Sequence, residues 1–341
     1  MPASSTKPLR RTLTVLVLGL ALIAPGAADA AVLGNPSAPA PAGPVFDPDL
    51  CAVAGTTDLP GAPGTPIWGF AIRPTPTTDC ATVTPQLPGP VLEIPAGASV
   101  VLNVTNALDK PLDMTIPGLS FDPGPTQVGP GDTVPITFTA PSDPGTYLYS
   151  SVGDAGRQQL MGLYGALLVC TSTPCPSSGS EAGSAYDRAA TLVLSEIDTA
   201  FNNDPDGTGG FSMNDYSADY WLINGRPHTD ASSDVSAGAG DRVLLRYLSA
   251  GPENVTMTML GMRGRLLARD AYALTDPIDV VSETVPAGST ADMIATVPPG
   301  AVSGTRLPLY NRQLRLNNGS LGDPQFGPPD GGGMMTFIHV P

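Results

Sequence analysis

The sequence predicts an all-β protein made of two β-sandwiches in tandem. Of its 341 residues, 39 are glycine and 39 are proline, whereas only 14% are charged. This composition is typical of many short strands joined by turns rather than of long helices. The same order of turns and alternating strands also occurs twice along the chain. Because each copy could close one sandwich, the repeat predicts two domains.

The N-terminus has the order of a cleavable secretory signal. Three basic residues precede an apolar run over residues 13–23, and an Ala-Asp-Ala segment ends at residue 30. We therefore expect residues 1–30 to be a signal peptide, and the protein to be secreted into an extracellular or periplasmic space. No second long apolar run follows, so the mature chain is expected to have no membrane span.

The charge of the chain excludes one class of partner. The formal net charge is −15 at pH 7. A surface this acidic repels phosphate backbones, so we expect no binding to nucleic acid.

Four cysteines in an exported chain predict two disulfides. They are Cys51, Cys80, Cys170 and Cys175, and the sequence alone allows three pairings. We favour Cys51–Cys80 with Cys170–Cys175, because this pairing staples the N-terminal loop and the end of the first domain locally. The alternative is a set of catalytic or metal-binding thiols, which an oxidising compartment disfavours.

The domain boundaries follow from shifts in composition. The first domain is expected over residues 31–175, and it begins with an extended Pro/Ala-rich leader over residues 31–50. A segment of small polar residues over 176–184 predicts a linker. The second domain is then expected over residues 185–341.

Residues 145–169 carry the best evidence for the fold. A turn at Pro144 and Gly145 leads into a β-branched and aromatic strand, and an apolar strand follows over residues 163–169. This stretch resembles the last two strands of a cupredoxin domain in the multicopper oxidase family. There, Gly-Thr-Tyr-Trp-Tyr-His-Ser-His is followed by Gly-Leu-Tyr-Gly-Ala-Leu-(Ile/Val)-Val. The second half matches nearly letter for letter, and the resemblance implies cupredoxin-like Greek-key sandwiches.

The resemblance extends over nearly the whole mature chain. Pro-Gly-Pro-Val at 88–91, before a glycine turn and an alternating strand over 100–105, resembles the opening of a multicopper oxidase domain. In the second copy, Leu-Ser-Glu-Ile-Asp at 194–198 and Tyr-Trp-Leu-Ile-Asn-Gly at 220–225 resemble a later domain of the family. That domain is either the middle one, which binds no copper, or the copper-binding C-terminal one.

The residues at the family's ligand positions differ from the family pattern. A blue copper site needs a thiolate and two imidazoles, and the family adds a three-copper cluster held by eight more imidazoles, yet this chain has two histidines. The resemblance therefore implies that the copper sites have been dismantled. The substituted ligand positions are Thr115, Pro117, Ser150 and Val152 in the first copy and, if the second copy is the C-terminal domain, Val255, Thr258, Leu260, Met262, Asn311, Arg312 and Gln313.

A methionine-rich segment offers a different metal site. Met257, Met259 and Met262 form a Met-x-Met-x-x-Met run whose soft thioethers suit Cu(I). Methionine also fills gaps in apolar cores, and core packing is the reading we favour.

A calcium loop is a further alternative. Asn202, Asp204 and Asp206 match alternate oxygen-donor positions of such a loop, with Gly207 at the bend. The twelfth position, which should be glutamate, is Met213. We therefore favour a solvated turn.

These observations together predict a secreted multicopper oxidase-like protein that has lost its copper ligands and acts as a non-catalytic binding, assembly or structural protein. No catalytic residue, cofactor-binding residue or cofactor is assigned. The alternative is a copper-dependent oxidoreductase, or a Cu(I)-binding protein, that uses the methionine-rich site. Family analogy implies a homo-oligomer of three chains, and an extracellular protein is the other expected partner.

Overall fold

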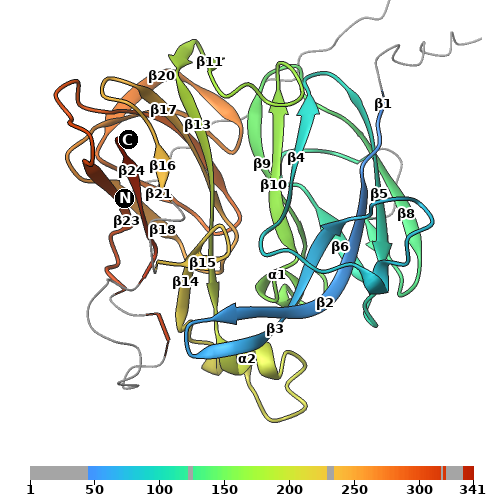
Figure 1. The fold of residues 1–341 in the computed structure, drawn as a ribbon. Coiled ribbons are helices and arrows are strands. Elements are labelled where there is room, and N and C mark those ends of the chain that lie inside the picture. The colour runs from blue at the N-terminus through green and yellow to red at the C-terminus, as the bar shows by residue number, and fades with distance from the viewer. Residues whose placement is uncertain (1–44, 122–125, 229–233, 316–317, 320–332) are drawn as a thin grey trace, which may run out of the picture. The chain divides into compact units, whose positions relative to one another are not determined.

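The described chain folds into two β-sandwiches, each made of two facing sheets (Figure 1). The structure is a computed structural model that describes residues 45–121, 126–228, 234–315, 318–319 and 333–341. The predicted signal peptide, and the predicted leader as far as residue 44, lie outside these residues. The prediction of an all-β, cupredoxin-like fold is confirmed.

The first sandwich contains strands β1 to β10. One sheet has the strand order β1-β5-β2-β3, with β8 also paired to β5, and the other has the order β4-β10-β9-β6-β7. The bounds are β1 Val45–Phe46, β2 Asp49–Leu59, β3 Ala62–Ile72, β4 Gly89–Pro95, β5 Ser99–Asn106, β6 Leu112–Thr115, β7 Gln127–Val128, β8 Thr133–Thr139, β9 Gly145–Ser151 and β10 Tyr164–Cys170. The last residues of the predicted leader are therefore strands of the first sheet.

The second sandwich contains strands β13 to β24. One sheet has the order β15-β14-β13-β17-β22-β19-β20, and the other has the order β16-β24-β23-β18-β21. The bounds are β13 Arg188–Ile197, β14 Tyr220–Ile223, β15 Arg226–Pro227, β16 Val235–Ser236, β17 Arg242–Ser249, β18 Val255–Met259, β19 Gly264–Arg269, β20 Tyr272–Val280, β21 Ser282–Val285, β22 Thr290–Thr296, β23 Arg306–Asn311 and β24 Met335–His339.

Alternation along the strands builds the two cores. In β5, Val100, Leu102 and Val104 are buried in the first core, while the residues between them are half-buried. In β17, Val243 and Leu245 face the second core in the same way. This is the period-two pattern that a sandwich strand requires.

β9 and β10 are buried along their whole length. One face of their sheet packs on the first core, and the other packs on the second sandwich, where Leu148 and Ala166 join a cluster with Val193 and Leu248. β10 and β13 lie side by side in the middle of Figure 1. Because both faces are covered, the strand reads as a continuous apolar run rather than as an alternating one.

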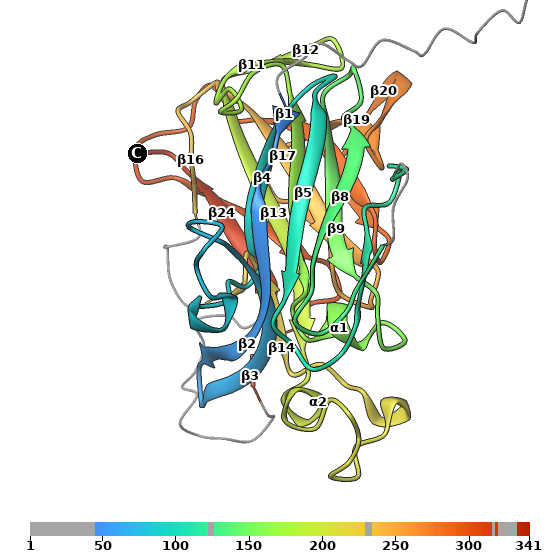
Figure 2. The same ribbon diagram turned by 90° about the vertical axis from the view of Figure 1, so that its right-hand side faces the viewer.

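The β2–β3 hairpin also reaches the second sandwich. The Tyr220 hydroxyl donates to the Pro60 carbonyl at 2.6 Å, and Asn202 Nδ2 donates to the Pro66 carbonyl at 2.8 Å. Helix α2, Thr199–Asn203, lies beside this hairpin in both ribbon views (Figure 2). The two sandwiches are thus joined by direct hydrogen bonds as well as by apolar packing.

The segment predicted as a linker is an ordered hairpin. β11 Gly179–Glu181 pairs with β12 Ser184–Tyr186. Glu181 is buried in this hairpin, although its sequence of small polar residues predicts solvent exposure. The physical reason is a buried arginine of the second sandwich, described below.

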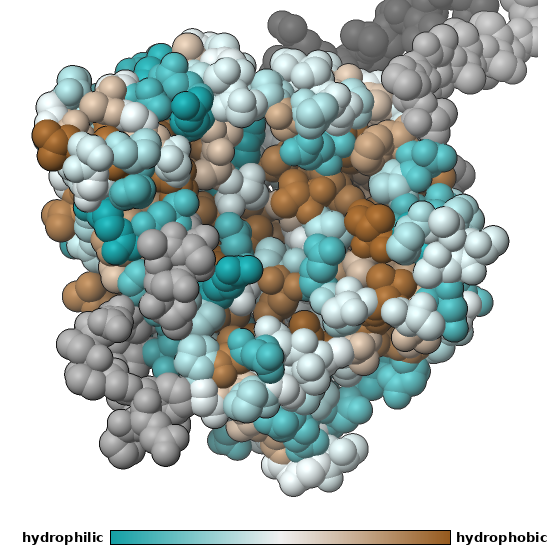
Figure 3. All heavy atoms as spheres, viewed as in Figure 1, coloured by the Kyte–Doolittle hydropathy of each residue, from teal (hydrophilic) through white to brown (hydrophobic). Residues whose placement is uncertain are grey.

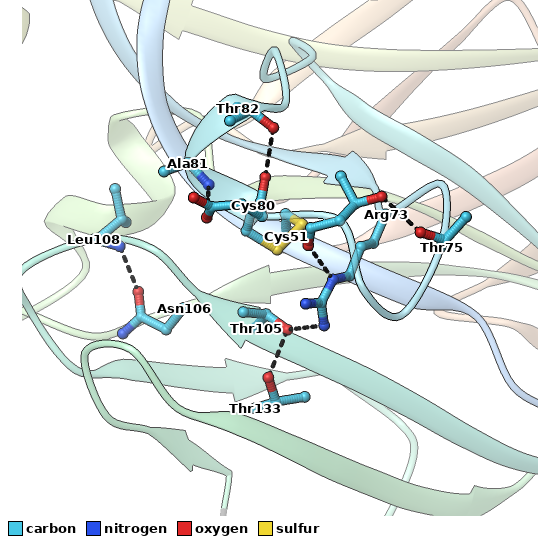
Figure 4. Close-up of a disulfide and its surroundings, with 12 residues drawn as sticks. Cys51, Arg73, Thr75, Cys80, Ala81, Thr82, Thr105, Asn106, Leu108 and Thr133 are labelled. Carbon is cyan, nitrogen blue, oxygen red and sulfur yellow. Dashed lines mark hydrogen bonds between the residues drawn. A yellow bond between two sulfur atoms is a disulfide. The ribbon is translucent and has the colours of Figure 1, made fainter.

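Both predicted disulfides are confirmed. Cys51 on β2 is bonded to Cys80 at the start of the short 3-10 helix η1, Cys80–Thr82, and Cys170 is bonded to Cys175. Figure 4 shows the first disulfide beside Arg73, whose side chain donates to the Thr78 carbonyl and to Thr105 Oγ1. The bridge therefore holds the loop after β3 against the first sheet.

Helices are few and short in the described residues. α1 spans Arg157–Leu160, and the 3-10 helix η2 spans Met213–Asp215. None of the helices in this part of the chain has the length and hydrophobicity that a membrane span needs.

Candidate functional site

In the first sandwich, two of the four substituted ligand positions face each other. Thr115 on β6 and Ser150 on β9 are cross-strand partners. Ser150 is fully buried and Thr115 is half-buried. Pro117 lies beyond the end of β6 and is exposed, as is Val152, which is 39% exposed. The paired positions thus offer two hydroxyl groups where the family pattern has imidazoles.

In the second sandwich, positions 255–262 follow β18 and the loop after it. Val255 points into the core, whereas Thr258 lies on the other face and donates its hydroxyl proton to the Val281 carbonyl at 2.8 Å. Leu260 is 60% exposed. These positions are thus divided between the core, the opposite face of β18 and the exposed loop after it.

The three remaining positions follow one another at the end of β23. Asn311 is buried, and its Nδ2 donates to Gln313 Oε1 at 3.1 Å. Gln313 in turn donates its backbone N–H to Asn311 Oδ1 at 3.1 Å. Both polar atoms of the Asn311 side chain are thus bonded to Gln313, while Arg312 between the two residues is exposed.

A pocket of about 890 Å³ brings four of the second-sandwich positions together. Thr258, Leu260, Met262 and Arg312 all line it, at the point where the chain crosses from β18 in one sheet to β19 in the other. We refer to it as the β18–β19 pocket. It is the candidate site because it gathers positions that are spread over 55 residues of sequence.

The β18–β19 pocket is strongly cationic. Four arginines line it: Arg242, Arg263, Arg265 and Arg312. The only acidic residue among its described lining is Asp279, which lies 3.9 Å from Arg265. Of these four arginines, sequence reasoning had singled out only Arg312. The available signal was the pair of arginines on either side of Gly264, in a chain that is otherwise so acidic.

The predicted Cu(I) methionines lie in the core of the second sandwich. Met257, Met259 and Met262 are between 2% and 7% exposed and share one apolar cluster with Met293 and Met334. The sulfur atoms of Met259 and Met293 both pack closely against Gly264, since a Cβ built on that glycine would lie 3.4 Å and 3.2 Å from them. Met262 and Met259 also border the β18–β19 pocket.

The predicted calcium ligands make other interactions. Asp204 accepts the backbone N–H groups of Gly209 and Phe211, each at 2.9 Å, and these hydrogen bonds lower its pKa. Asp206 forms an ion pair with Lys110. Asn202 is buried in α2. Among the described residues, no group of three His, Cys, Asp or Glu side chains is placed to hold a metal ion.

A buried charged cluster lies where the two sandwiches meet. Arg246 donates to both carboxylate oxygens of Glu181, at 2.9 Å and 2.6 Å, and to Thr146 Oγ1 at 3.0 Å. Its cross-strand partner Asp292 is also buried, and this burial raises the pKa of Asp292 above its usual range, against the opposing effect of Arg246. The Arg246 guanidinium explains why Glu181 of the predicted linker is held inside the protein.

A second buried carboxyl group, that of Glu196, lies on β13. Its side chain is 3% exposed. Burial, followed by the charge of Glu253, raises its pKa to about 7. The nearby Tyr164, contributed by β10 of the first sandwich, also has its pKa raised by burial. Neither group lines the β18–β19 pocket.

Comparison with known proteins agrees with this architecture. Residues 70–173 match the family model of the multicopper oxidase. The chain is 24% identical over 297 residues to the multicopper oxidase MmcO of Mycobacterium tuberculosis, covering 75% of this chain and 56% of that protein. It is 34% identical over 127 residues to copper resistance protein A of Escherichia coli, covering 34% of this chain and 19% of that protein.

Among solved structures, the blue copper oxidase from Nitrosomonas europaea superimposes with a TM-score of 0.69 at 20% identity. The match covers 87% of this chain and 86% of that one. A copper nitrite reductase from the same organism gives a TM-score of 0.63 at 19% identity, covering 87% of this chain and 94% of that one.

The structural matches define a cupredoxin-fold protein. Together with the sequence matches, they support the predicted resemblance to the multicopper oxidase family. The matched segments cover about half the length of MmcO and about a fifth of copper resistance protein A.

Proposed function

We propose that this chain is a secreted, multicopper oxidase-like binding protein that no longer holds redox copper. The observation that carries the proposal is the chemistry of the ligand positions that meet in space. Thr115 and Ser150 offer hydroxyl groups, and the positions in the β18–β19 pocket offer a hydroxyl, a thioether, an alkyl group and a guanidinium. A blue copper site needs a thiolate with imidazoles, and all four cysteines are in disulfides.

The electrostatics of the pocket support the same proposal. Four guanidinium groups around one cavity repel a metal cation, and a single carboxylate does not balance them. A multicopper oxidase-like frame with such a pocket suits recognition rather than electron transfer, since a fold can persist after its chemistry is lost.

A Cu(I)-binding protein is the second candidate. The clustering of Met257, Met259 and Met262 with Met293 and Met334 favours it, because thioethers are soft ligands. The same clustering also serves core packing, so the two readings differ in whether Cu(I) is taken up.

A protein partner or a second copy of the chain is also proposed. On the face seen in Figure 3, hydrophobic side chains gather over the first sandwich. The exposed large apolar residues of that sandwich include Ile72, Val91 and Val152, and such surfaces often mark protein contacts. Sedimentation analysis of the mature chain would test the expected trimer.

Copper loading tests the proposal. The mature chain, stripped with EDTA, is incubated with Cu(II) in air or with Cu(I) without oxygen, and copper per chain is counted after gel filtration. We expect far less than one copper per chain in both arms and no copper–thiolate absorption band. One tightly held Cu(I) per chain, lost in Met257→Leu, would support the second candidate instead. One or more Cu(II) with a visible band would contradict the proposal.

A further inference from the structure

We propose that the β18–β19 pocket binds a small organic or inorganic polyanion, meaning a molecule with at least two carboxylate or phosphate groups. This ligand class would be the one that the proposed binding function recognises. It rests on that proposed function in one respect, namely that the pocket holds no copper.

The distribution of charge is the first argument. The chain has 16 basic residues against 31 acidic ones, yet four arginines and one aspartate line this pocket. Several other arginines in the described chain are paired with acids, as Arg246 is with Glu181 and Arg269 with Glu283. On so acidic a protein, arginines normally find a carboxylate partner. The fold must therefore keep these four side chains away from acidic neighbours for the local positive charge to persist.

The guanidinium groups of the pocket are largely uncommitted. Within the described residues, the side chains of Arg242, Arg263 and Arg312 form no hydrogen bond or ion pair. Arg265 has only the long, exposed contact with Asp279 at 3.9 Å. Each group therefore retains its five N–H donors for a ligand, and a guanidinium binds carboxylate or phosphate through two parallel hydrogen bonds.

The four arginines come from separate parts of the second sandwich. Arg242 begins β17 opposite Thr296, and Arg265 lies on β19 opposite Ile294. Arg263 precedes β19, and Arg312 is fixed after β23 by its backbone N–H, which donates to the Thr256 carbonyl at 2.8 Å. Because paired strands set these backbone positions, the cluster is built into the fold rather than gathered along one flexible loop.

The rest of the lining sets the kind of anion. Tyr310 adds a hydroxyl group, whereas the hydroxyl of its cross-strand partner Thr258 already donates its proton to the Val281 carbonyl. The exposed Leu260 and Val281 add an apolar rim, at 60% and 48% exposure. A cavity of about 890 Å³ is the size that proteins use for small molecules rather than single ions. The fit is to a compact molecule with several charges on a carbon or phosphate frame.

Calorimetric titration of the metal-free, full mature chain tests the inference. The probes are citrate for the carboxylate source and inorganic pyrophosphate for the phosphate source, with acetate as the single-charge control. The variants are Arg263→Gln and Arg312→Gln. Arg157→Gln is the matched control, because Arg157 lies on α1 of the first sandwich, outside the pocket.

We expect citrate or pyrophosphate to bind with a stoichiometry of one, and acetate not to bind. Each pocket variant should weaken binding about tenfold or more, since a hydrogen bond to a charged group contributes about 1.5–3 kcal/mol. Arg157→Gln should leave the affinity unchanged, and added salt should weaken binding. The better of the two probes identifies the source of the anion.

Absence of binding by both probes at low salt would overturn the inference, as would equal affinity in the pocket variants and the wild type. Neither result depends on copper, because the protein is metal-free throughout. Failure here therefore leaves the copper-loading test intact, and copper uptake at the methionines would leave this titration intact.

Discussion

Gly165 shows how one residue links the sequence motif to the fold. A Cβ at this position would lie 2.4 Å from the Tyr149 ring and hydroxyl. The missing side chain lets the fully buried Tyr149 lie against β10 and donate its hydroxyl proton to the Pro90 carbonyl at 2.7 Å. The second glycine of the Gly-Leu-Tyr-Gly-Ala motif is therefore needed because a side chain on this strand would clash with the Tyr149 ring, and not because the chain turns there.

Gly165→Ala should destabilise the protein by about 1–3 kcal/mol, because overpacking displaces the tyrosine ring or the strand. Gly300→Ala is the matched control, since a Cβ there meets nothing within 4 Å. Urea unfolding of both variants measures the difference. Equal stability of Gly165→Ala and the wild type would show that the ring is free to move.

Glu196 should make stability fall as pH rises. Its pKa is raised from 4.5 to about 7 in the folded protein, so between these values the unfolded chain releases a proton that the folded chain keeps. The free energy of unfolding is therefore highest below about pH 4.5 with respect to this group. It falls by about 3 kcal/mol as the pH rises to about 7.

Glu196→Gln removes this titration while keeping the shape of the side chain. Its gain in unfolding free energy over the wild type should be small at pH 5 and reach about 3 kcal/mol at pH 8. Urea unfolding at the two pH values measures it. A gain that does not change with pH would refute the raised pKa.

At the level of elements, the two disulfides should differ in their contribution. The bridge Cys51–Cys80 closes a separation of 29 residues, and Cys170–Cys175 closes one of 5. Loop entropy predicts a loss of about 3–4 kcal/mol when the first is replaced by alanines and about 2 kcal/mol for the second. Thermal unfolding of the two double-alanine variants ranks them. A larger loss from the short bridge would mean that native contacts, rather than loop closure, decide the effect.

Strands were predictable from the sequence where one local rule decides the structure. Alternation places Val100, Leu102 and Val104 in the core, and the apolar run of β10 indicates burial on both faces. The hairpin over β11 and β12 was not predictable, because its small polar residues indicate a solvated segment. What holds it in place is Glu181, whose partner Arg246 is 65 residues away.

For the candidate site, sequence reasoning could find positions but not their neighbours. The resemblance identified Thr258, Leu260, Met262 and Arg312 by alignment, and the structure brings these four to one pocket. Arg242 and Arg265 join them only through strand pairing across the second sandwich. Such proximity depends on register between distant strands, which no local pattern encodes.

At the level of the whole molecule, the two sandwiches share a buried surface that depends on both. β9 and β10 are covered by the second sandwich, and Thr290 Oγ1 donates to the Thr146 carbonyl across the junction at 2.9 Å. Neither sandwich would keep these strands buried alone. We therefore expect the described sandwiches to unfold together rather than in sequence.

The central claim is that a multicopper oxidase-like frame here serves binding without redox copper. The most direct measurement is the copper-to-chain ratio of the mature protein after Cu(II) loading and gel filtration, read together with its visible spectrum. The account predicts a ratio far below one and a colourless protein. A ratio of one or more with a copper–thiolate band would contradict it.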